Sequence, residues 1–133
     1  MRFALPLVLL ALAGCAADPA APGAPTEFRD KADYRAQREA TASTLAAAIE
    51  PATATQVAAC RVVATSEQAC GGPTSFAVYS AQSPEADEVE RLAERLVALD
   101  RLANAQFEYV STCMAYDPPV PVLRGGVCVA GGR

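Results

Sequence analysis

The sequence lacks histidine and tryptophan altogether, and aromatic residues make up only 6% of its 133 residues. The missing histidine removes the commonest general base and the commonest zinc ligand. No GxxxxGK[ST] or GxGxxG segment is present to cradle a phosphate group. These absences predict a chain that is not an enzyme and that uses no metal ion or organic cofactor. A pair of carboxylates in a cleft, as in glycosidases, is the enzymatic alternative.

Positive charge is also scarce, because 15 acidic residues outnumber 11 basic ones and the net charge is −4. Nucleic acids and anionic lipid surfaces bind basic patches, so no nucleic-acid partner is expected. Hydrophobic residues make up 52% of the chain, but many of them are alanine. Length and composition therefore predict one small domain at most.

A mainly apolar run, residues 3–13, follows Arg2 at the N-terminus. The run is shorter than the roughly 20 residues that a helix needs to span a bilayer. A short basic segment followed by such a run is typical of a signal peptide. We therefore assign residues 1–14 to a signal peptide.

The end of this segment, Leu12-Ala13-Gly14-Cys15, resembles the lipobox of bacterial lipoproteins. The resemblance implies cleavage before Cys15, attachment of fatty acids such as palmitate to this residue, and anchoring in the lipid bilayer. Ala16 and Ala17 differ from the aspartate that commonly retains lipoproteins in the inner membrane. The resemblance therefore implies the bacterial outer membrane, with the folded part facing the periplasm. An ordinary cleaved signal followed by a coincidental cysteine is the alternative.

Once the anchor takes one cysteine, four remain in an oxidising compartment and predict two disulfide bonds. Three pairings are possible, and we favour the local ones, Cys60–Cys70 and Cys113–Cys128, because each brackets a turn-like segment. Zinc binding is the competing use of these cysteines. The pairs are separated by nine and fourteen residues, so they lack the close spacing of structural zinc ligands.

Three segments follow the signal peptide. Residues 15–25 are mostly alanine, proline and glycine after the cysteine, and predict a flexible tether. Residues 26–50 are charged and alanine-rich, which predicts a helix that ends before Pro51. The few large apolar residues of this helix do not form a single stripe, so we expect it to pack loosely or to become ordered on a partner. Residues 51–133 are expected to form a small disulfide-linked domain.

Within this domain, residues 83–110 predict the main helix, because Ser83 can cap its start and its apolar residues recur on one face. Before the helix, residues 57–65 and 75–81 are rich in small, β-branched and aromatic residues and predict a hairpin.

After the helix, residues 111–116, 120–123 and 127–129 are candidates for short strands. Two prolines between the first two segments exclude a central strand, so we expect these pieces at an edge or in a loop. The predicted fold class is α+β, with a small antiparallel sheet packed against one main helix.

Two features are candidates for function. Gly71, Gly72 and Pro73 predict a tight reversal next to a disulfide, and such a rigid loop is a candidate binding surface, with ordinary turn architecture as the alternative. Asp100 projects onto the apolar face of the main helix, where a carboxylate needs a partner. We expect a structural ion pair with an arginine such as Arg61, or a cap for a neighbouring turn. A ligand-binding acid is the alternative.

The Cys70-Gly71-Gly72-Pro73 loop, the Val78-Tyr79-Ser80 segment and Ser111-Thr112-Cys113 together resemble small proteobacterial lipoproteins with a domain of unknown function. The resemblance covers residues 57–129 and implies no catalytic residue. We therefore expect a membrane-anchored envelope lipoprotein that binds a periplasmic or envelope protein, for instance an incoming hydrolase that it inhibits. A structural or assembly accessory that docks through residues 26–49 is the alternative.

Overall fold

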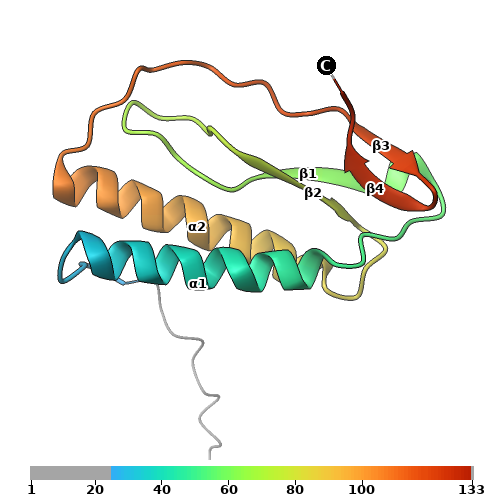
Figure 1. Cartoon of the computed structure of the whole chain (residues 1–133), viewed down its shortest axis with the longest axis horizontal. Helices are drawn as coiled ribbons and strands as arrows, with labels where there is room; N and C mark the ends of the chain where they lie inside the picture. The colour runs from blue at the N-terminus through green and yellow to red at the C-terminus, as the bar shows by residue number, and fades with distance from the viewer. Residues whose placement is uncertain (1–24, 133) are drawn as a thin grey trace, which may run out of the picture.

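The computed structural model describes residues 25–132, so the signal peptide, Cys15 and nearly all of the tether lie outside the described residues. Two helices lie side by side, and a β-hairpin extends over them, with a second hairpin at one end (Figure 1). The α+β fold class is confirmed. The elements in chain order are α1 (Lys31–Ile49), η1 (Val57–Ala59), β1 (Cys60–Ala64), β2 (Phe76–Ser80), α2 (Ala86–Phe107), β3 (Pro121–Arg124) and β4 (Val127–Ala130).

The predicted main helix is α2. The N-cap is Glu85 and no side chain caps the helix, so the prediction that Ser83 caps it is wrong. The Ser83 hydroxyl oxygen instead accepts a hydrogen bond from the backbone N–H of Glu85 at 3.2 Å, in the turn before the helix. Asp87 and Glu88 in the first turn complement the positive end of the helix dipole. The helix ends where Glu108 adopts a left-handed conformation with φ 51°. Its buried stripe is Val89, Leu92, Ala93, Leu96, Leu99, Asp100 and Ala103.

Helix α1 packs closely along α2, which differs from the loose packing expected of it. It starts at Lys31, where the Asp30 side chain accepts hydrogen bonds from the N–H groups of Ala32 and Asp33. Leu45 and Thr41 on its inner face are buried. The expectation was wrong because Leu45 packs into a core cluster with residues of α2, and Tyr34 and Arg38 contact α2 through polar bonds to its Asp100 side chain. The packing therefore does not depend on a single stripe of large apolar residues.

The start of the described chain is also held in the core. Phe28 is 1% exposed and lies among aromatic side chains from both helices. Its backbone N–H and C=O are both bound by the side-chain amide of Gln106, at 2.8 and 2.7 Å. The segment before α1 is therefore part of the same packed unit as α2.

The four strands form two separate antiparallel pairs, β1–β2 and β3–β4, and not the single sheet expected. Residues 111–116 form no strand, so of the two predicted alternatives, an edge strand or a loop, this segment is a loop. Cys113 has a left-handed φ of 54°, which a strand cannot accommodate. The two prolines that follow, at 118 and 119, remove backbone donors as well.

The β1–β2 hairpin lies between the helices and the β3–β4 hairpin. On one face, Val63 and Tyr79 pack in the cluster that includes α2. On the other face, Cys60 and Val78 pack against β4. Alternation along each strand produces this division, because neighbouring side chains point to opposite faces.

The two disulfides are Cys60–Cys128 and Cys70–Cys113, so the predicted number is confirmed and the predicted local pairing is wrong. Cys60 begins β1, whereas Cys70 lies in the loop beyond the other end of that strand. A strand rises about 3.3 Å per residue, so β1 holds these two cysteines too far apart to bond. Each cysteine instead bonds to a distant segment that packs beside it.

Candidate functional site

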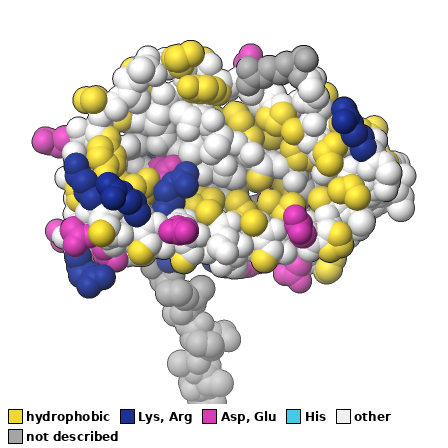
Figure 2. Space-filling model, in the orientation of Figure 1, with side chains coloured by type: hydrophobic (Ala, Val, Ile, Leu, Met, Phe, Trp, Pro, Cys, Tyr) yellow, Lys and Arg dark blue, Asp and Glu magenta, His cyan; other side chains and the backbone are white. Residues whose placement is uncertain are grey.

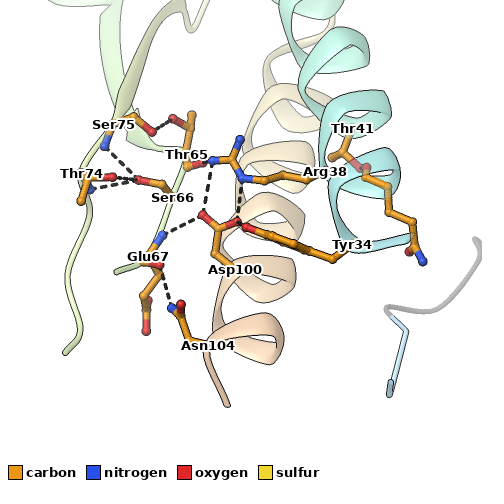
Figure 3. Close-up of polar contacts among 11 residues, drawn as sticks. Tyr34, Arg38, Thr41, Thr65, Ser66, Glu67, Thr74, Ser75, Asp100 and Asn104 are labelled. Atoms are coloured by element: carbon orange, nitrogen blue, oxygen red, sulfur yellow. Dashed lines mark hydrogen bonds and ion pairs between the residues drawn. The ribbon is translucent and has the colours of Figure 1, made fainter. Parts of the chain in front are cut away.

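The Asp100 carboxylate is the centre of a polar network between the helices and the β1–β2 loop (Figure 3). Its Oδ1 atom accepts hydrogen bonds from the Tyr34 hydroxyl at 2.9 Å and from Arg38 Nε at 2.7 Å. Its Oδ2 atom accepts from Arg38 Nη2 at 3.3 Å and from the backbone N–H of Glu67 at 3.1 Å. Asp100 is 5% exposed. Each of its oxygens thus has two donors within the chain.

This network gives Asp100 both roles that the sequence suggested, but with a different arginine. Arg61 donates to the carbonyl oxygens of Ala58 and Cys60, so the expected pairing of Arg61 with Asp100 is wrong. Arg38 is the partner, and the bond to the Glu67 N–H caps the neighbouring loop. Because both oxygens are occupied by donors of the chain itself, Asp100 positions other groups and is not available to a ligand.

The sequence signal for the partners of Asp100 is a spacing within α1, which the expectation of Arg61 did not use. Tyr34 and Arg38 are four residues apart, so they lie on one face of α1. Burial, and then the hydrogen bond to Asp100, raises the pKa of Tyr34 to about 12. The hydrogen bond to Asp100 also raises the pKa of Arg38, which stays fully charged. The network is therefore an ion pair with a neutral phenol beside it.

The same stretch of α2 holds the β1–β2 loop through three contacts to Glu67. Asp100 accepts from its N–H, and Asn104 Nδ2 donates to its C=O at 2.9 Å. Arg101 forms an ion pair with its carboxylate at 2.8 Å. The backbone and the side chain of one loop residue are thus both bound to α2, and Figure 3 shows the two backbone contacts.

Within the loop, Ser66 ties its two sides together, since its hydroxyl oxygen accepts from the N–H groups of Thr74 and Ser75 at 2.9 Å. Further out, the backbone C=O of Gln68 accepts from the Gly71 N–H at 2.9 Å, and its N–H donates to the Gly72 C=O at 3.0 Å. Gly71 and Gly72 have φ of 89° and 85°, which favour glycine. The predicted reversal is confirmed at these residues.

The tip of this loop is joined to the segment after α2. The Cys70–Cys113 disulfide links the two, and Gln68 Nε2 donates to the Met114 C=O at 2.7 Å. Between them lies a hollow of about 240 Å³. We call this region the loop surface; it is lined by Gln68, Cys70, Gly71, Gly72, Pro73, Cys113, Met114, Ala115 and Tyr116.

The structure therefore separates the candidate residues into two groups. Gly71, Gly72 and Pro73 line the loop surface, where Met114 is 56% exposed and Tyr116 is 39% exposed. Asp100 lies beneath the loop and supports it through Glu67. Cys15, the predicted lipidation site, lies outside the described residues.

Comparisons with protein-family models, with curated proteins and with solved structures give no match. Among residues 25–132, no group of three or more histidine, cysteine, aspartate or glutamate side chains is arranged to hold a metal ion. The helices in this part of the chain are not apolar and long enough to cross a membrane.

Proposed function

We propose that this chain is a membrane-anchored envelope lipoprotein whose domain is a non-enzymatic binding module for a protein of the envelope or periplasm. An incoming hydrolase that the domain inhibits is one partner of this kind. Cys15 would provide the anchor, through the lipobox that Leu12-Ala13-Gly14-Cys15 resembles. The observation that carries the binding role is the loop surface, which is exposed and yet tied to the rest of the fold by a disulfide and hydrogen bonds.

The support for binding is energetic. A flexible loop loses conformational entropy when it docks, and a preorganised loop loses little. The loop surface is held by the Cys70–Cys113 disulfide, by the Gln68 contact to Met114 and by the three α2 contacts to Glu67. Met114 and Tyr116 then offer exposed apolar area of the type that is enriched at interfaces.

The alternative role, an assembly accessory that docks through residues 26–49, has less support. The apolar residues of this segment are used inside the chain, since Phe28 and Leu45 are buried against α2. Docking through them would require α1 to leave α2 and would break the Arg38 contact with Asp100. The loop surface requires no such rearrangement.

Crosslinking and affinity purification from detergent-solubilised envelope would test the binding role. The double variant Met114→Ser/Tyr116→Ser removes the exposed apolar area, and we expect the captured protein to be lost with it. Val57→Ser is the matched control, because Val57 is 54% exposed and lies in η1, outside the loop surface. Equal recovery from the double variant and the control would contradict the proposal.

The anchor is tested separately by fractionating cells that express Cys15→Ser. We expect this variant to leave the membrane fraction and to lack the fatty-acid mass found on the unmodified chain. A Cys15→Ser protein that still sediments with the outer membrane would contradict lipid anchoring at this residue. This fractionation tests the anchor alone, and the affinity purification tests the binding role of the loop surface.

A further inference from the structure

A second hollow lies at the other end of the β1–β2 hairpin, where the C-terminal end of α1, β2 and β4 meet. It has a volume of about 610 Å³, within the range of ligand sites in proteins. We call it the edge groove; it is lined by Ile49, Glu50, Pro51, Ala52, Val78, Val127, Cys128 and Val129. Figure 2 shows hydrophobic side chains gathered over this part of the molecule.

The backbone of β2 has an unused hydrogen-bonding edge at this groove. Two backbone hydrogen bonds establish which facing pairs of the hairpin are bonded. The Ala81 N–H donates to the Ala59 C=O, and the Thr65 N–H donates to the Ser75 C=O. Bonded pairs alternate in an antiparallel ladder, so Tyr79 directs its N–H and C=O toward β1 and Val78 directs its own away. Since β2 pairs with β1 alone among the described strands, the Val78 edge is free.

The opposite wall of the groove already pairs with an extended segment of this chain. The Cys128 N–H donates to the Ala52 C=O, and the Ala54 N–H donates to the Gly126 C=O, both at 2.9 Å. This pairing forms the isolated bridge between Thr53 and Val127. It stops at Ala52, because the chain before it belongs to α1 and the turn that follows that helix. The outer edge of β4 is thus able to accept extended backbone.

We propose that the edge groove binds an extended peptide segment of a partner protein, which adds as a strand to the free edge of β2 at Val78. The free N–H and C=O groups distinguish this occupant from a fatty acyl chain, which would leave both groups unpaired in an apolar site. Alternate side chains of the peptide would contact Ile49, Val127 and Val129. This site is separate from the loop surface and does not depend on its function.

Charge adds a second requirement on the peptide. Glu50 is exposed, and it is the one charged residue among the described residues that line the groove. The groove lining therefore offers it no basic side chain as a partner. A lysine or arginine beside the apolar residues of the peptide would be favoured over an acidic residue.

A displayed library of random peptides, selected on the full mature chain, tests this inference. We expect enrichment of alternating apolar and polar sequences that carry lysine or arginine. Val78→Pro removes the free N–H without removing a bond to β1, because proline is tolerated at the outward-facing positions of an edge strand. Selected peptides should bind this variant at least about tenfold more weakly. Val78→Ala keeps the N–H and should weaken binding only a few fold.

Hydrogen exchange provides a readout that needs no variant. In the unmodified protein, a saturating amount of a selected peptide should slow exchange of the Val78 amide, while the Tyr79 amide, already bonded to β1, changes little. The Met114→Ser/Tyr116→Ser variant should bind the same peptide unchanged, which separates this site from the loop surface. The inference is overturned if selection enriches no peptide, if the Val78 amide is not protected, or if a decanoate probe occupies the groove and displaces the peptides.

Discussion

Arg38 on α1 and Asp100 on α2 meet with 2.7 Å between Nε and Oδ1, although 62 residues separate them in the sequence. The same carboxylate binds the Glu67 N–H, so one buried aspartate connects both helices to the loop that carries the candidate binding surface. Direct hydrogen bonds to this one side chain therefore link the two helices to the exposed loop. Stability and loop geometry should therefore change together when Asp100 is replaced.

Asp100→Ala should lower the free energy of unfolding by about 2–4 kcal/mol, because it leaves the partly buried Arg38 charge and the Glu67 N–H without their acceptor. Urea unfolding followed by circular dichroism measures this loss. Glu88→Ala is the matched control, since it breaks an exposed ion pair with Arg91 and should cost less than about 1 kcal/mol. Similar losses in the two variants would contradict the structural role of Asp100.

Stability should fall as the pH rises from about 10 to 12. Burial, followed by hydrogen bonds to Asp100 and Glu90 respectively, raises the pKa values of Tyr34 and Tyr79 to about 12. In this window the unfolded chain releases phenol protons that the folded chain retains, so the stability present below pH 10 is lost. Tyr34→Phe and Tyr79→Phe should each make the free energy of unfolding, measured by urea unfolding at a series of pH values, fall less steeply with pH. If the double phenylalanine variant loses stability with pH as steeply as the unmodified protein, the two tyrosines are not the cause of the loss.

The two disulfides should differ in their response to limited reduction. Cys70 and Cys113 are exposed, whereas Cys60 and Cys128 are each 4% exposed. A short treatment with dithiothreitol followed by iodoacetamide should label the first pair alone, as mass spectrometry of peptides can establish. In denaturant both pairs should become labelled together. Early labelling of Cys60 or Cys128 in the folded protein would contradict the buried position of that bond.

Gly71→Ala should lower the free energy of unfolding by about 1–2 kcal/mol, because its φ of 89° is unfavourable for a residue with a Cβ atom. Apart from Gly71 and its two chain neighbours, no atom of the described chain lies within 4 Å of the added carbon, so the loss arises from the backbone and not from a clash. Gly132→Ala is the control, as it also meets no described atom and its φ lies outside the left-handed region. Thermal unfolding of the two variants makes the comparison, and equal midpoints would be inconsistent with the loop conformation described.

Local patterns in the sequence predicted the secondary structure correctly where that structure depends on neighbouring residues alone. The apolar stripe of residues 83–110 predicted α2, and Gly71-Gly72 predicted the reversal between β1 and β2, since helix periodicity and positive φ depend on adjacent residues. The need of Asp100 for an arginine also followed from its position on an apolar face.

Tertiary structure alone decided which distant residues meet. It selected Arg38 over Arg61, joined Cys60 to Cys128 and Cys70 to Cys113, and divided the strands into two pairs. Each of these choices depends on how the rigid elements stack, because a strand or a helix of fixed length carries its residues away from their sequence neighbours. The sequence by itself determined what most segments become and which residues need partners. The packing of α1, of β4 and of the segment after α2 determined which partners they have.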